Sequence, residues 1–161
     1  MTFQALWLAA LAAPASALLN LTATLANQTD LSNLTSFISY LQPVLSVLSS
    51  ATNITILAPS NQAFTSYLNS SASTALANNN TALVDALLDY HVIRGTYNAS
   101  TITKQASFLH TDLTTSRYAN VSNGQVVEGI VIGSNVTFFS GLLANSTVTT
   151  AVCRFPTLEC R

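Results

Sequence analysis

Two pairs of polar side chains have a spacing that could support acid–base chemistry. Asp85 and Asp89 are four residues apart, so a helix would place both carboxylates on one face, where they could act on a glycosidic bond. His110 and Asp112 are two residues apart and would share one face of a strand, with Ser107 on the other face. Solvent-exposed positions explain both pairs more simply, and the sequence contains no G-x-S-x-G, H-E-x-x-H, phosphate-binding or dinucleotide-binding motif. We therefore predict no catalysis, no cofactor and no metal, with a secreted glycan-acting hydrolase as the enzymatic alternative.

A second chemistry, N-linked glycosylation, is indicated along most of the chain. Ten of the fourteen asparagines begin an N-x-S/T sequon, whereas chance would give roughly three or four. Charged residues make up 7% of the chain, against about 25% in an average soluble protein, so glycans would supply the solubility that charges do not. The alternative is a polar composition without glycosylation. The predicted sites are Asn20, Asn27, Asn33, Asn53, Asn69, Asn79, Asn98, Asn120, Asn135 and Asn145.

The start of the chain, residues 1–17, has the layout of a secretory signal peptide. An apolar run from Ala5 to Ala13 is followed by an A-x-A cleavage site at Ala15-Ser16-Ala17, although no Lys or Arg precedes the run. The run is shorter than the ~20 apolar residues that span a bilayer. We expect removal of residues 1–17, an N-terminal leader over residues 18–30, and a secreted mature chain without a transmembrane segment.

Charge and cysteine content narrow the classes of partner. The formal net charge of -1 argues against nucleic acid and against anionic lipid, because both attract a basic surface. Cys153 and Cys160 could form a disulfide in an oxidising compartment, and their spacing matches no zinc-binding pattern.

The elements that would position these residues change from helical to extended along the chain. Apolar residues recur at helical spacing from Leu31 to Leu48, with Asp30 as a candidate N-cap and a kink at Pro43. Further helices are predicted over residues 61–68 and after Thr81, which is the expected N-cap of a helix that runs into the extended segment at residue 90. Extended segments are predicted at residues 54–57, 90–93, 108–113, 125–131, 135–139 and 147–152, with turns at Asn123-Gly124 and Gly133-Ser134. Helices in the first half and strands in the second favour an α+β domain.

Two segments carry a resemblance to a known family. Residues 55–64 read Thr-Ile-Leu-Ala-Pro-Ser-Asn-Gln-Ala-Phe, in which Asn61 lies where a helix N-cap is expected. Residues 87–97 read Leu-Leu-Asp-Tyr-His-Val-Ile-Arg-Gly-Thr-Tyr. In this order and spacing the two segments resemble the boxes of the fasciclin-like domain family, over roughly residues 31–150. The resemblance implies helices packed on a β-wedge or sandwich. It also implies a binding module for cell adhesion or for matrix or cell-wall interaction, with a cell-surface or matrix protein or a polysaccharide as partner.

Within the second segment, Tyr90 and His91 have two interpretations. The residues alone predict that they alternate with Val92 across a sheet, with the imidazole buried and bonded to neighbouring groups so that it fixes a helix to a strand. The family resemblance implies instead that Tyr90 and His91 take part in adhesion through receptor contact. The two roles are compatible, since a fixed Tyr-His pair also shapes the surface beside it.

The last eleven residues depart from the family pattern. After residue 150 the family continues with a strand, an Asn-Gly turn and a further apolar strand, whereas residues 151–161 contain two cysteines and Pro156. We expect a domain that lacks its last core strand, followed by an off-pattern tail. A truncated or shifted reading frame that yields a nonfunctional fragment is therefore a third interpretation.

Overall fold

The computed structural model describes residues 25, 27–39, 41, 48, 51, 53–69, 73, 80–97, 99–121 and 123–149. The predicted signal peptide, Asn20, Asn79, Asn98, the region of Pro43 and the tail with Cys153 and Cys160 lie outside these residues. The chain forms two compact units: unit 1 comprises Met1–Thr52 and Pro59–Ser66, and unit 2 comprises Asn53–Ala58 and Tyr67–Arg161.

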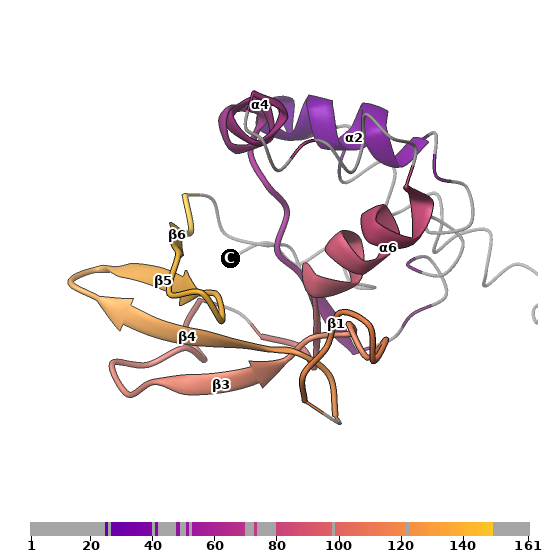
Figure 1. Ribbon diagram of the computed structural model, residues 1–161. Helices are drawn as coiled ribbons and strands as arrows, with labels where there is room; N and C mark the ends of the chain where they lie inside the picture. The colour runs from indigo at the N-terminus through magenta and orange to yellow at the C-terminus, as the bar shows by residue number, and fades with distance from the viewer. Residues whose placement is uncertain are drawn as a thin grey trace, which may run out of the picture. The chain divides into compact units, whose positions relative to one another are not determined.

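The described part of unit 1 is helical. A 3-10 turn, η1 (Thr29–Leu31), leads into α2 (Ser32–Ser39), and α4 (Asn61–Leu68) begins in the same unit (Figure 1). The predicted helical periodicity is confirmed over α2, where Leu34 and Ile38 are buried one turn apart. The prediction of Asp30 as N-cap is wrong, because this residue lies inside η1. Phe37 of α2 meets Phe64 of α4 edge to face, with ring centroids 5.4 Å apart.

Asn61 fixes the start of α4 against the start of α2. The prediction that it caps α4 is wrong: it is the first helical residue, and Ser60 Oγ accepts a hydrogen bond from an amide of the first turn (3.3 Å). The Asn61 carboxamide instead accepts from the Asn33 amide and donates to the Thr29 carbonyl and to Ser32 Oγ, each at 2.9 Å.

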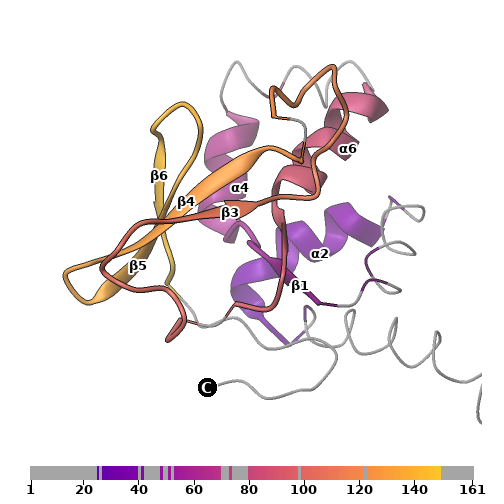
Figure 2. The same ribbon diagram turned by 90° about the horizontal axis from the view of Figure 1, so that it is seen from below.

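Unit 2 begins with a two-stranded antiparallel sheet. β1 (Ile54–Ile56) pairs with β2 (Val92–Arg94), so that Thr55 lies opposite Ile93. Helix α6 (Thr81–Tyr90) runs directly into β2 (Figure 2). Its N-cap is Asn80, whose side chain accepts from an amide three residues later (3.2 Å), so the prediction of a cap at the next residue is wrong by one position.

The second half of the chain forms a four-stranded antiparallel meander (Figure 1). Its strands are β3 (Ser107–His110), β4 (Val126–Ile132), β5 (Asn135–Phe139) and β6 (Asn145–Thr147), paired in that order. The bridge between Ile93 and Thr111 and the hydrogen bond from the Asp112 amide to the Val92 carbonyl (2.7 Å) connect β2 to the chain that follows β3. β6 ends at Thr147, whereas the last strand was predicted to begin at this residue, so the observed strand lies earlier in the chain than the predicted one. This α+β architecture confirms the predicted fold class.

The core of unit 2 lies between β2 and the meander. Ile93 is 0% exposed and packs in one cluster with Ile102, Leu109 and Val127. Both predicted turns are present: Gly133 has a φ of +65° in the two-residue β4–β5 turn, as a type II′ turn requires. Gly124 has a φ of +100°, and a Cβ at this position would lie 2.5 Å from the Thr111 carbonyl oxygen.

Candidate functional site

Tyr90 and His91 lie where α6 ends. Tyr90 is the last helical residue, and His91 is the C-cap with helical dihedral angles (φ −87°, ψ −4°). The prediction that both alternate along a strand is wrong, because β2 begins at Val92. The helix continues one residue further than β propensity suggested because His91 Nδ1 bonds the Leu87 carbonyl one turn back, at 2.7 Å.

His91 joins α6 to the chain around β1. Its backbone carbonyl accepts a hydrogen bond from the Leu57 amide at 2.8 Å, just beyond the end of β1. With the Leu87 carbonyl as its partner, Nδ1 carries the proton in the neutral ring, which leaves Nε2 as an acceptor. The residue as a whole is half-buried. The positioning role predicted from the residues fits this geometry.

Tyr90 contributes to the packing of unit 2. Its ring is half-buried and packs against the cluster around Ile93. Its ring lies perpendicular to that of His91, with centroids 6.3 Å apart, and its hydroxyl accepts a long hydrogen bond from the Gly141 amide at 3.4 Å. The pair therefore holds the end of α6 to β2 and to the β5–β6 loop.

Charged side chains surround the end of α6. Burial raises the pKa of Asp89 above its ordinary value of 3.8, and the negative charges of Asp112 and Asp85 raise it further. Arg94 Nε donates to Asp112 Oδ1 at 3.1 Å, and both side chains are partly exposed. The interpretation of the first acidic pair as solvent-exposed holds for Asp85, whereas Asp89 is half-buried.

His110 and Asp112, considered above as a possible acid–base pair, have other partners. β3 ends at His110, and Asp112 lies beyond the strand with its carboxylate on Arg94. His110 Nδ1 is 3.5 Å from the Gly124 carbonyl. Among the residues that the structure describes, no group of three His, Cys, Asp or Glu side chains could hold a metal ion.

All seven sequon asparagines that the structure describes are exposed: Asn27, Asn33, Asn53, Asn69, Asn120, Asn135 and Asn145. Asn53 differs from the others because its backbone φ is +57° and its Oδ1 accepts from Thr96 Oγ1 at 2.9 Å. A glycan on Asn53 must therefore extend from a side chain that already has a partner.

Sequence reasoning missed the role of Thr55. Its side chain is 7% exposed, and its hydroxyl donates to the Gly95 carbonyl and accepts from the Tyr97 amide, both at 2.8 Å. These bonds fix the turn after β2 against β1. The type of residue gives no signal for this role, because threonine also suits the strand and completes the Asn53 sequon.

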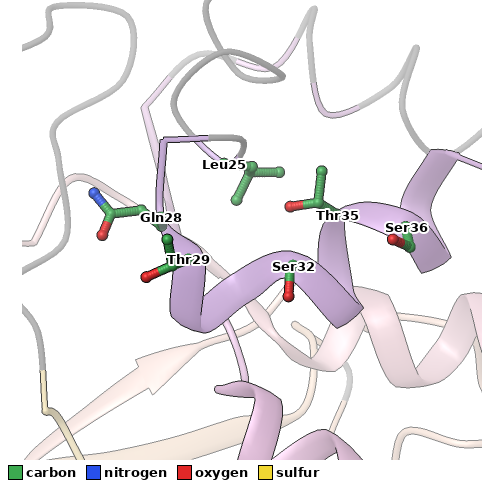
Figure 3. Close-up of a pocket in the computed structure, with 6 residues that line it drawn as sticks. All are labelled: Leu25, Gln28, Thr29, Ser32, Thr35 and Ser36. Atoms are coloured by element: carbon green, nitrogen blue, oxygen red, sulfur yellow. The ribbon is translucent and has the colours of Figure 1, made fainter.

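Unit 1 has an open hollow of about 440 Å³ (Figure 3). The hollow lies along η1 and the first turns of α2, and its lining is formed by Leu25, Gln28, Thr29, Ser32, Thr35 and Ser36. No side chain in that lining titrates near neutral pH, and Thr35 Oγ1 already donates to the Leu31 carbonyl at 2.9 Å. The hollow therefore offers hydroxyl and amide contacts without acid–base chemistry.

No helix among the described residues is long and apolar enough to cross a membrane.

Comparison with known proteins identifies a family. The family model described as "Fasciclin domain" matches residues 30–151. A similar curated protein is the "Fasciclin-like arabinogalactan protein" of Arthroderma benhamiae, which is 28% identical over 120 residues. The alignment covers 74% of this chain and 28% of that relative, so the chain spans less than a third of the relative's length.

Proposed function

Because this chain belongs to the fasciclin domain family, whose members serve in adhesion and binding, we propose that it is an exported, N-glycosylated module for cell adhesion or for matrix or cell-wall interaction. The family match over residues 30–151 is the observation that carries the proposal. The sequence layout of residues 1–17 and the exposure of the seven described sequon asparagines support export and glycosylation.

The proposed contact surface surrounds Tyr90 and His91. His91 caps the end of α6 and is partly exposed, and Asp89 and Arg94 lie two and three residues from it in the chain. A partly exposed aromatic ring with charges of both signs nearby in the chain suits a protein partner, since an aromatic anchor supplies affinity and charges select the partner. A cell-surface or matrix protein is therefore the first candidate, and a polysaccharide is the alternative.

Two substitutions of His91 separate contact from positioning. His91→Asn places an amide donor where Nδ1 lies and can keep the bond to the Leu87 carbonyl, whereas His91→Ala removes both ring and bond. The full chain is secreted, immobilised and tested for cell attachment, and its thermal unfolding is followed by circular dichroism. If the ring contacts a partner, both variants lose at least about tenfold in attachment affinity, roughly 1.4 kcal/mol, while His91→Asn keeps its melting temperature. Full attachment by a stable His91→Asn protein would overturn the contact role.

The raised pKa of Asp89 is the observation that favours a glycan-acting hydrolase as second candidate. A carboxyl group whose pKa is raised by burial and by neighbouring carboxylates is a feature of general acids in glycoside hydrolysis. The test is release of reducing sugar from cell-wall polysaccharides by the secreted protein and by Asp89→Asn. Activity that disappears with Asp89→Asn would favour the hydrolase over the binding module.

A further inference from the structure

One face of the meander combines apolar side chains with two sequons. Residues directly opposite each other in antiparallel strands share a face. The register places Phe108 opposite Glu128, Glu128 opposite Phe139, and Phe139 opposite Asn145, so these four side chains form a row across all four strands. We call this side the Phe108 face.

The second sequon lies on the same face. Ile132 is paired with Asn135. Asn135 is four residues from Phe139 along β5, and because side chains alternate between the two faces, this even separation places it on the Phe108 face. The hydroxyl residues that complete the two sequons, Thr137 and Thr147, are paired with each other on this face as well. Both complete sequons thus project from adjacent strands toward the same apolar side chains.

Apolar side chains at two places on this face are open to solvent. Phe108 is 70% exposed and Ile132 is 52% exposed, whereas Phe139 is half-buried and Thr137 is 5% exposed. In the β5–β6 loop, Leu142 (92%) and Leu143 (78%) are exposed three and two residues before Asn145. Large exposed apolar side chains are a feature of surfaces that another group covers.

Other exposed large apolar side chains in the described part of the chain also lie next to a sequon. The two remaining examples are Leu68 and Val121, which directly neighbour the sequon residues Asn69 and Asn120. The strand register places the two glycan attachment sites next to apolar side chains of the Phe108 face. Paired side chains have Cβ atoms about 5 Å apart, so a glycan on Asn135 or Asn145 starts beside Ile132 or Phe139.

We propose that N-linked glycans on Asn135 and Asn145 cover the exposed apolar side chains of the Phe108 face, whose paired row has Glu128 as its one charged member. The proposal rests on the export of the chain, which is part of the proposed function. Carbon–hydrogen faces of the sugar rings pack on the apolar side chains, and the sugar hydroxyls face the water. The occupant is the chain's own glycan, because both attachment sites already lie on this face.

The test uses the full chain secreted from a eukaryotic host. Site occupancy is mapped by mass spectrometry of glycopeptides, and exposed apolar surface is measured by binding of a fluorescent hydrophobic dye. The double variant Asn135→Gln/Asn145→Gln removes both glycans from the Phe108 face. Asn27→Gln is the matched control, since Asn27 is an exposed sequon residue in a turn of unit 1.

We expect both sites to be glycosylated, and dye binding by the double variant to rise severalfold while the control stays unchanged. Adding Phe108→Thr to the double variant should lower dye binding most of the way back to the wild-type value, because the exposed ring is then gone. If Asn135 and Asn145 are unoccupied while other sequons have sugar, the inference is overturned and export stands. Equal dye binding by the double variant and the control would have the same consequence. Absence of sugar from every sequon would overturn export together with it.

Discussion

Replacing Thr55 by valine tests whether one hidden hydroxyl holds β1 to the turn after β2. Valine has the shape of threonine, so Thr55→Val opens no cavity but leaves the Gly95 carbonyl and the Tyr97 amide without their 2.8 Å partners. An unsatisfied buried polar group costs about 1–3 kcal/mol, which gives roughly 2–6 kcal/mol for the two. Because Gly95 and Tyr97 are themselves half-buried and water can reach them in part, we expect the lower end, about 2–3 kcal/mol.

Thr55→Ser is the matched variant. Serine keeps the hydroxyl and the sequon and loses one methyl group, at a cost of about 1 kcal/mol. Each protein is treated with an endoglycosidase before measurement, so that loss of the Asn53 sequon in Thr55→Val does not affect the comparison. Chemical unfolding gives the free energy, and the melting temperature of Thr55→Val should fall by at least about 8 °C. A Thr55→Val protein as stable as Thr55→Ser would refute the account of Thr55 as a satisfied buried hydroxyl.

Three further outcomes follow from geometry and charge. Gly124→Ala should destabilise the protein by more than about 2 kcal/mol, because the new Cβ would lie 2.5 Å from a backbone carbonyl oxygen. Gly133→Ala, with open space around the new Cβ, should cost about 1 kcal/mol. Equal losses of the two variants in chemical unfolding would contradict this. The raised pKa of Asp89 means that its charge opposes folding above that pKa, so Asp89→Asn should raise the melting temperature at pH 7 and lose this advantage as the pH falls through the raised pKa toward 3.8. A gain independent of pH would refute the assignment. A double-mutant cycle on Arg94 and Asp112 should give a coupling energy under about 1 kcal/mol that weakens with salt, since both side chains are exposed; a coupling above about 2 kcal/mol would be inconsistent with a solvated pair.

Elements whose pattern is local were predictable from the sequence. β5 (Asn135–Phe139) and α4 (Asn61–Leu68) have the predicted bounds, because Gly133-Ser134 fixes the start of one and Pro59-Ser60 precedes the other. The end of α6 was not predictable in this way. Tyr, Val and Ile favour strands, and the bond from His91 to a carbonyl one turn back outweighs that preference at the end of the helix.

The candidate sites show the same division. Sequons and the Tyr90-His91 pair can be recognised from residue types alone. The Phe108 face depends on which residues lie opposite each other, which is set by strand register across three hairpins. Thr55 depends on a partner forty residues away, and no local pattern encodes that distance.

The pairing of β1 with β2 also has a consequence for the order in which unit 2 folds. Strands β3 to β6 pair only with their sequence neighbours, whereas β1 and β2 must close residues 57–91. For a chain of this length the length-dependent part of closure entropy is roughly 3 kcal/mol. Contacts of short sequence separation form faster, so the hairpins should assemble first and present Ile93 with a surface to dock on through the Thr111 bridge. During synthesis β1 emerges well before its partner β2, so it stays unpaired at least until Val92–Arg94 has been made.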